Sequence, residues 1–322
     1  MTASTHHRLV GLEPENLLAF LALLGLLRAL DKAQPEWRAR VYWDVTRPPL
    51  RPVLMLAAEQ SEEAVATVVA EGAAALAVAH CFDRKDLNFP GIEARKLFGD
   101  AEDPLREELL DALMSDGATR EDGSIWPTPL CFQFGQGHQH FLSRLADIPI
   151  GRLPAKLTRI RHPPALNSPD HIAAALFTSW TRNDATDGLR WDPAEDRRYA
   201  LRANDPSGNP AGMQHGANRL ATVGIAALAG AVVVRRGETR FLNTATSYRP
   251  DGRIQITWPI WTVPARLHGI RALLTHPALA ANIDEISETI GELAPLGVAF
   301  AFRAQRISVG KFFNVTPAER VG

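Results

Sequence analysis

Residues 14–30 read PENLLAFLALLGLLRAL and open the most apolar part of the chain. Pro14 is suited to the first turn of a helix, and apolar residues then follow on nearly every side of the helical projection. Because a helix that is apolar all round packs against several neighbours, the segment predicts a buried helix at the centre of the fold. Its core, residues 17–27, is too short to span a bilayer, and Glu13 and Glu15 precede it where a secretory signal carries positive charge.

Outward from this helix, periodicity predicts further helices and short strands. Helices are expected at residues 61–80, 104–114, 138–146, 169–180, 214–229, 264–274 and 277–293. Strands are expected at residues 38–44, 52–56, 126–134, 232–235, 239–243, 253–258 and 297–303, with a hairpin turn at residues 236–238. The order lacks a regular βαβ alternation and therefore predicts an α+β fold with short antiparallel strands. Several prolines and no acid in residues 148–164 suggest a boundary, giving a mixed domain (1–147), a basic Pro-rich linker (148–168) and an α+β domain (169–322).

Composition limits the classes of function. The 322 residues are 46% hydrophobic with a net charge of −1, which predicts a globular protein without a global field that would attract nucleic acid. Any such contact must come from local patches. The two cysteines, Cys81 and Cys131, support neither a disulfide framework nor a zinc ribbon, and they favour a reducing cytoplasmic location.

A long mixed-charge segment follows the helix expected at 169–180. From Arg182 to Asp205 it holds five arginines and six acids, interrupted by Trp191 and Tyr199. Long irregular segments in compact domains are usually functional or disordered, and the aromatic residues argue against disorder. One interpretation is a salt-bridged knot that orders the loop. Another is a surface that docks a protein partner through Trp191 and Tyr199.

Two other patterns offer side chains for a catalytic or metal site. His138 and His140 have the spacing that places two imidazoles on one side of a strand, but they lack a nearby third ligand in the sequence. Carboxylates for a metal-dependent hydrolase or nuclease are available in the mixed-charge segment: Asp184, Asp187, Asp192, Glu195 and Asp196. Nucleotide-binding, hydrolase, zinc-protease and kinase signatures are absent from the sequence, which favours a binding subunit over an enzyme, with no cofactor or metal.

Basic residues gather at two places that suit a polyanion. The first lies between residues 151 and 161, and the second is the aromatic C-terminal run of residues 300–320, where Phe312 and Phe313 stand next to basic residues. Arginines of the mixed-charge segment form a second tier. The residues expected to neutralise phosphates are Arg152, Lys156, Arg159, Arg161, Arg306 and Lys311, followed by Arg197, Arg198 and Arg202.

Three blocks of the sequence resemble proteins of type I-G (formerly I-U) CRISPR effector complexes. LVGLEPENLLAFLALLGLLRALD (residues 9–31) is similar to the start of their large subunits, and PLCFQFGQGHQHFLSRL (129–145) resembles a glycine-rich motif of the same subunits. The loop at 191–220, together with QITWPIW (255–261), resembles accessory proteins of these systems. The blocks are spread over about half of the chain, and none is a catalytic fingerprint.

The resemblance implies a large-subunit or accessory role in an RNA-guided antiviral complex. Its partners would be guide RNA, target DNA and other CRISPR effector subunits, and no membrane. In such complexes base pairing reads the sequence while the protein reads backbone shape. The sequence therefore predicts a non-catalytic, cytoplasmic, nucleic-acid-binding subunit. The alternatives are a metal-dependent nuclease or hydrolase that uses acids of residues 184–205, and an assembly scaffold that contacts only proteins.

Overall fold

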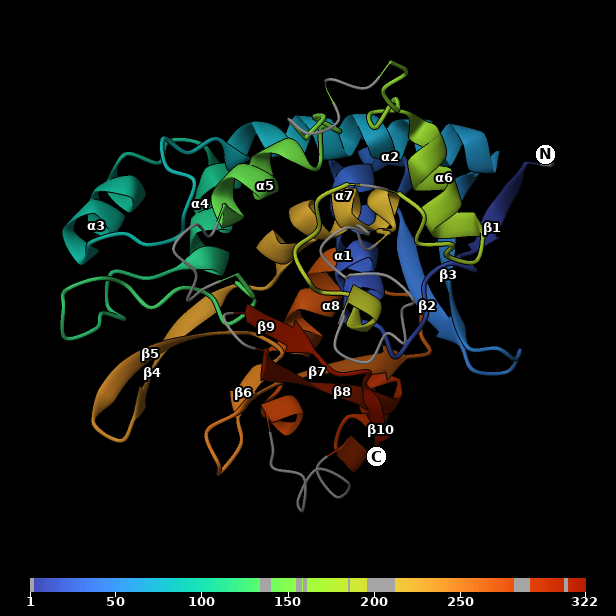
Figure 1. The fold of residues 1–322 in the computed structure, drawn as a ribbon. Coiled ribbons are helices and arrows are strands. Elements are labelled where there is room, and N and C mark those ends of the chain that lie inside the picture. The colour runs from blue at the N-terminus through green and yellow to red at the C-terminus, as the bar shows by residue number, and fades with distance from the viewer. Residues whose placement is uncertain are drawn as a thin grey trace, which may run out of the picture.

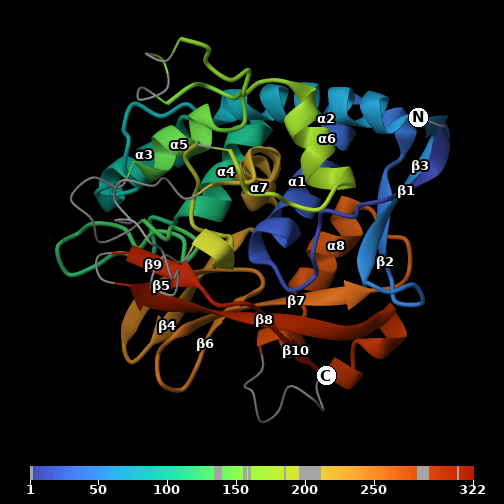
Figure 2. The same ribbon diagram turned by 45° about the vertical axis from the view of Figure 1, so that its right-hand side comes forward.

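The computed structural model describes residues 3–133, 140–154, 158, 161–184, 186–195, 212–280, 290–309 and 312–322. These residues contain eight α-helices and ten β-strands. Helices and antiparallel sheets are segregated rather than alternating, so the fold is α+β, as the sequence predicted. Figures 1 and 2 show α1 (Leu17–Ala33) and α7 (His215–Gly224) between α2 (Glu62–Leu76) above and the largest sheet below.

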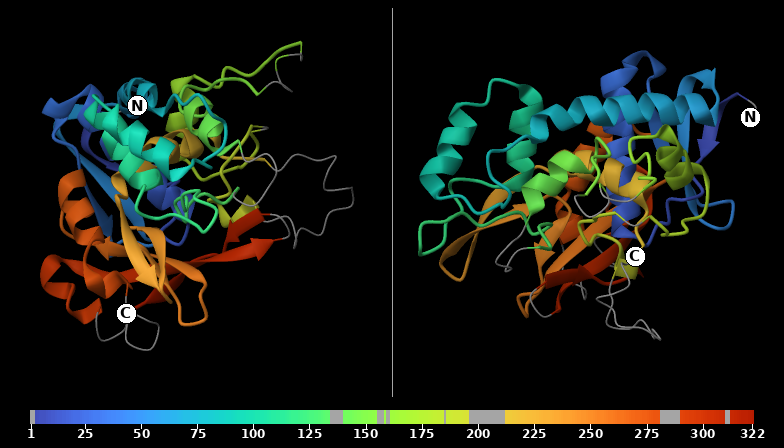
Figure 3. Two further views of the ribbon diagram at one scale, coloured as in Figure 1. Left: turned by 90° about the vertical axis from the view of Figure 1, so that its left-hand side faces the viewer. Right: turned by 45° about the horizontal axis from the view of Figure 1, so that its top comes forward.

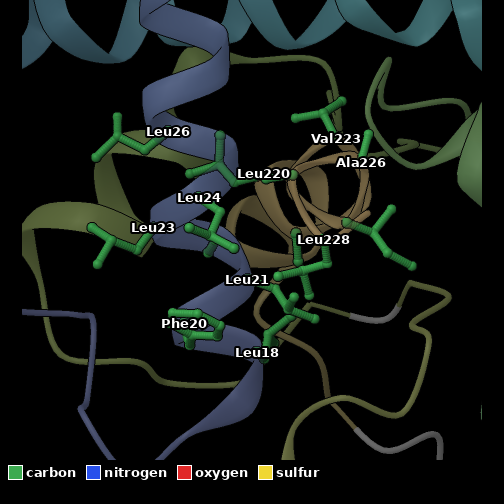
Figure 4. Close-up of a cluster of buried hydrophobic side chains, with 14 of the residues drawn as sticks. Leu18, Phe20, Leu21, Leu23, Leu24, Leu26, Leu220, Val223, Ala226 and Leu228 are labelled. Atoms are coloured by element: carbon green, nitrogen blue, oxygen red, sulfur yellow. The ribbon is translucent and has the colours of Figure 1, made fainter. Parts of the chain in front are cut away.

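Helix α1 is the central element that the sequence predicted. It begins after Asn16, whose extended backbone stops the helix and whose side chain accepts hydrogen bonds from the backbone N–H groups of Leu18 and Ala19. Pro14 consequently lies before the helix rather than in its first turn. Residues 17–30 are all buried, and all ten residues of α7 are buried as well. Figure 4 shows their leucine and valine side chains meeting in one cluster.

The backbones of α1 and α7 meet at two glycines. A Cβ atom on Gly25 would lie 1.9 Å from the carbonyl oxygen of Leu220, and one on Gly224 would lie 2.1 Å from the carbonyl oxygen of Leu21. Both distances are far below van der Waals contact. Only glycine therefore permits this crossing, and the closeness of the axes lets the surrounding leucines interdigitate.

Helix α2 crosses α1 and packs against α6 (Pro169–Phe177). Gly72 in α2 takes part in this crossing, because a Cβ atom there would lie 2.1 Å from the carbonyl oxygen of Ala29 in α1. Residues 62–80 are the one segment within the described ranges that is long and apolar enough to cross a membrane by composition, and 56% of the tested window is buried inside the protein. Such burial is what a core helix shows.

The remaining helices surround the central pair: α3 (Gly91–Gly99), α4 (Pro104–Leu113), α5 (Phe141–Asp147) and α8 (Leu267–Leu274). A charged cluster joins three helices. Arg28 of α1, only 6% exposed, donates to Glu108 of α4 at 2.7 Å, and Arg271 of α8 donates to the other oxygen of that carboxylate at 2.8 Å. Glu108 thereby compensates the one charged side chain that is buried in α1.

The largest sheet lies beneath α1. Its strand order is β10 (Glu319–Val321), β8 (Val298–Val309), β7 (Ile254–Trp261) and β6 (Thr246–Tyr248), and β9 (Phe312–Val315) pairs with β8. All eight residues of β7 are buried. Trp258 of β7 stacks on Phe20 of α1, with ring centroids 5.4 Å apart, and its indole N–H donates to the carbonyl oxygen of Pro14.

Two smaller sheets flank this core, as the views in Figure 3 show. One has the order β1 (Ser4–Arg8), β3 (Arg51–Gln60) and β2 (Arg40–Asp44). The other is the hairpin of β4 (Gly230–Arg235) and β5 (Glu238–Asn243). Arg236 and Gly237 at its tip both have positive φ, as a two-residue type I′ turn requires, which confirms the predicted hairpin.

One strand expected from the sequence is not formed in its described part. Residues 126–133 form no strand, because Pro127 and Pro129 lack the N–H groups that a ladder needs. The domain boundary at residues 148–168 stays a prediction, and the segments on its two sides contribute to one hydrophobic core. Helix α1, from the first predicted domain, packs chiefly against α7, from the second, and one buried cluster includes both.

We expect Gly25→Ala to lower the free energy of unfolding by about 3 kcal/mol or more, because the new methyl group overlaps the backbone of α7. Gly269→Ala in α8 is the matched control, since a Cβ there meets nothing within 4 Å. Because alanine has a higher helix propensity than glycine, Gly269→Ala should raise the free energy of unfolding by up to about 1 kcal/mol. Thermal and denaturant unfolding would measure both, and equal stability of the two variants would contradict the backbone contact.

Candidate nucleic-acid interface

The basic segment after α5 is described in part. Lys156 and Arg159 lie outside the described residues. Arg161 is exposed, and Arg152, with 66% of its side chain exposed, forms an ion pair with Asp147 at 2.8 Å. Residues 148–164 contain no acid, but Arg152 nevertheless has an acidic partner. The last turn of α5 supplies the acid.

Arg306 of β8, which the sequence predicts to neutralise phosphates, is half-buried. Its guanidinium group donates to the carbonyl oxygen of Pro129 at 3.0 Å and lies 4.2 Å from the ring centroid of Phe313. These two contacts, with the loop at Pro129 and with Phe313 of β9, account for the burial of the side chain. Burial lowers the pKa of Arg306 to about 10, so the side chain remains charged at neutral pH. Lys311 lies outside the described residues.

Arg306 belongs to a larger surface that we call the Arg–aromatic groove. A cavity of about 150 Å³ and a wider hollow of about 660 Å³ lie next to each other, because Trp126 and Arg240 line both, and the groove consists of these two hollows. The groove is defined by six residues that come from the loop after α4, from β5, β6 and β8, and from β9: Arg120, Trp126, Arg240, Tyr248, Arg306 and Phe313.

Guanidinium groups lie against the aromatic rings of this groove. The guanidinium carbons of Arg240 and Arg120 lie 3.7 Å and 4.5 Å from the ring centroid of Trp126. Arg235 of β4 lies 4.4 Å from the ring of Tyr248. These contacts hold planar cations in fixed orientations at about the distance that cation–π attraction requires. Burial lowers the pKa of Arg120, with a smaller contribution from the charge of Arg240.

Charge is distributed unevenly along the groove. The wider part contains Glu121, Asp122 and Glu238, and Glu238 forms an ion pair with Arg240. The inner part contains Arg240 and Arg306 and no acid within the described residues. A polyanion would therefore meet net positive charge at the inner end.

The mixed-charge segment is placed by its contacts with the ends of α1 and α7. Trp191 is fully buried, and its indole N–H donates to the carbonyl oxygen of Leu130 at 2.9 Å. The prediction that Trp191 docks a partner is therefore wrong, because the side chain fills the core instead. The other residues predicted to bind from this segment lie outside the described residues: Tyr199, Arg197, Arg198 and Arg202.

Two acids of the segment satisfy the N-terminal ends of the central helices. Asp192, only 4% exposed, accepts from the side-chain amide of Asn16 at 3.0 Å and from Arg182 at 2.7 Å. Asp184 accepts from the backbone N–H of His215, the first residue of α7, at 2.8 Å. Carboxylates at these positions complement the positive ends of the helix dipoles. The interpretation as an ordering knot thus matches the described contacts.

Glu195 is a buried acid next to Asp192. One of its carboxylate oxygens accepts from the backbone N–H of Arg190 at 3.1 Å, while Oε1 has no hydrogen-bond partner. Burial, with a smaller contribution from the carboxylate of Asp192, raises the pKa of Glu195 to about 8, and the positive charge of Arg190 opposes this shift. Glu195 is therefore largely protonated at neutral pH.

His140 of the predicted histidine pair lies immediately before α5 in the left-handed region, with φ of 50°. Its backbone N–H donates to Asp86 at 2.7 Å. His138 and Asp196 lie outside the described residues. Within the described ranges, the structure contains no cluster of three or more histidine, cysteine or acidic residues suited to a metal ion.

Comparison of the chain with protein-family descriptions, with curated proteins and with solved structures gave no match. Sequence reasoning identified Arg306 and the phenylalanines beside it but missed Trp126 and Arg240. Their signal was weak, because they lie on separate elements that only the fold brings together.

We expect Glu195→Gln to stabilise the protein at pH 8 by about 2 kcal/mol or more, since the amide mimics the protonated acid. A raised pKa in the folded state means that wild-type stability falls as the pH rises from the unfolded value, near 4.5, through about 8. The advantage of the variant should therefore shrink toward pH 5. Denaturant unfolding across this range measures it, and a gap that does not change with pH would contradict the raised pKa.

Proposed function

We propose that the protein is a non-catalytic nucleic-acid-binding subunit of an RNA-guided CRISPR effector complex. The observation that carries the proposal is the Arg–aromatic groove, in which Arg120, Arg240 and Arg306 present guanidinium groups beside aromatic rings. The resemblance of three sequence blocks to type I-G effector proteins supports the same class of function.

The chemistry of the groove suits a single strand better than a duplex. Unpaired bases stack on aromatic rings and on the planar guanidinium group of arginine, while the cations neutralise the phosphates. The residues that line the groove lie in loops and strands, and none of those described belongs to a helix that would enter a major groove. A single strand of guide RNA or of displaced target DNA is therefore the ligand that we favour.

The neutral net charge of the chain agrees with a local interface. With a charge of −1 the protein has little long-range attraction for polyanions, so binding must rely on short-range contacts. In an effector complex, neighbouring subunits and base pairing would supply the remaining affinity and all of the sequence specificity.

The acids of the mixed-charge segment support this reading over the hydrolase alternative. Asp184 and Asp192 are engaged at the helix ends, and Glu195 is buried with a raised pKa. These three acids therefore have structural roles. Asp187, a further described acid of the segment, lines a cavity and lies 3.8 Å from Arg144.

We expect Trp126→Leu and Arg240→Gln each to weaken binding of a labelled single-stranded oligonucleotide about tenfold, because each removes a stacking surface or a phosphate partner. Arg306→Gln should act in the same direction. The arginine variants should also flatten the salt dependence by about one unit of slope per lost phosphate contact. Fluorescence anisotropy with RNA and DNA strands, from about 50 to about 200 mM salt, measures both quantities.

Arg253→Gln is the matched control, because Arg253 is 62% exposed, pairs with Asp251 and lies outside the linings of the groove. It should bind like the parent. Failure of the parent to bind any strand, or equal losses in the control and the groove variants, would refute the interface. Magnesium-dependent cleavage of the strand would revive the hydrolase alternative.

A further inference from the structure

Another cavity shares no lining residue with the Arg–aromatic groove and is not used in the proposed function. It has a volume of about 560 Å³ and opens between α5, the segment that follows it and the first residue of α7. Its walls combine apolar side chains, Ile148 and Leu166 among them, with polar groups. The size lies within the range of small-ligand sites in proteins.

Two buried polar atoms in this lining have no hydrogen-bond partner. His215 is 1% exposed, and its Nε2–H donates to the carbonyl oxygen of Leu166 at 3.0 Å, which leaves Nδ1 as an unprotonated acceptor without a donor. Thr186 is 5% exposed, and its hydroxyl group is also unpaired. Leaving a buried polar group unpaired costs free energy. Other described residues also have such atoms, but Thr186 and His215 line one cavity, which suits a polar ligand.

The acceptor on His215 persists across the physiological pH range. Burial lowers the pKa of His215 to about 3, and His171 and Arg219 add to the shift. The ring of His171 stands at 90° to that of His215, with centroids 5.2 Å apart, and the Nδ1 atom of His171 lies 3.6 Å from Asp184. A ligand must therefore offer an N–H or O–H donor to Nδ1, because the imidazole does not become a donor there.

Cationic groups accompany these atoms. Arg152 lines the cavity with 66% of its side chain exposed, so its guanidinium group reaches solvent while pairing with Asp147. Arg144 also lines the cavity, donates to the carbonyl oxygen of Gly188 at 3.0 Å and lies 3.8 Å from Asp187. Of these two arginines, Arg152 has the more exposed side chain. Arginine binds phosphate as well as carboxylate, so a phosphate could replace Asp147 as the partner of Arg152.

We infer that this cavity binds one nucleotide, whose base donates an N–H group to Nδ1 of His215 and bonds the hydroxyl of Thr186 while its phosphate contacts Arg152. The inference rests on the proposed function, which it deepens by giving an unstacked nucleotide a place away from the Arg–aromatic groove. The same chemistry arises from a nucleotide of a bound strand and from a free nucleotide, and the experiment separates these sources.

Calorimetric titration of the full chain with AMP tests the inference, with purine riboside 5′-monophosphate, which lacks the 6-amino group, as the paired ligand. AMP should bind about tenfold more tightly, because the analogue leaves a buried acceptor unpaired. Thr186→Val should weaken AMP binding about tenfold yet keep or raise the melting temperature, since it removes an unpaired buried hydroxyl group.

Arg152→Gln should also weaken AMP binding. Arg161→Gln is its matched control, because Arg161 is an exposed arginine of the same segment that does not line the cavity. The same four proteins are then titrated with the labelled single strand. A loss on Thr186→Val for AMP but not for the strand identifies a free nucleotide as the ligand, whereas a loss for the strand identifies an unstacked nucleotide of that strand.

The outcomes separate the two proposals. If the Trp126→Leu variant loses strand binding but keeps AMP binding, the result supports both the groove and the cavity proposals. A parent that binds AMP but no strand supports the cavity and overturns the proposed function. A parent that binds the strand, with no AMP binding and no effect of Thr186→Val or Arg152→Gln, overturns the cavity and leaves the proposed function standing.

Discussion

The backbones of α1 and α7 touch at Gly25 and Gly224, and the packing of the central core depends on that contact. Because no side chain separates the helices there, their leucines close into a single core that joins the two halves of the chain. The N-terminal ends of α1 and α7 are thereby fixed relative to each other, and they point their unsatisfied N–H groups at one segment of the chain. The helix crossing thus decides where the mixed-charge segment must lie.

That segment supplies the charge that the helix ends require. Asp192 serves the start of α1, through Asn16, and Asp184 serves the start of α7. The burial of Asp192 is tolerable because Asn16 and Arg182 donate hydrogen bonds to its carboxylate. Glu195 is buried with fewer hydrogen bonds, and its pKa is raised. Thr186 and His215 each keep a buried atom without a partner, and both residues line one cavity.

The Arg–aromatic groove lies on a different part of the molecule and arises in another way. Trp126 follows α4, Arg240 belongs to the hairpin of β4 and β5, and Arg306 belongs to β8. None of these residues would stand out in the sequence by itself. Together they place guanidinium planes against rings at 3.7–4.5 Å, an arrangement suited to a strand of nucleotides in a protein whose overall charge offers no attraction.

The sequence by itself determined the α+β class, the central buried helix and the β4–β5 hairpin, because hydrophobic periodicity, an apolar run and a turn that tolerates positive φ act locally. It also favoured an ordering role for the acids of the mixed-charge segment, which the contacts of Asp184 and Asp192 match. It could not show that Trp191 is buried, that Arg306 is half-covered by Pro129, or that Trp126 meets Arg240. Those outcomes depend on contacts between elements far apart in the chain, and only the tertiary structure decided them, because packing around the glycine crossing determines which of the many possible distant neighbours meet.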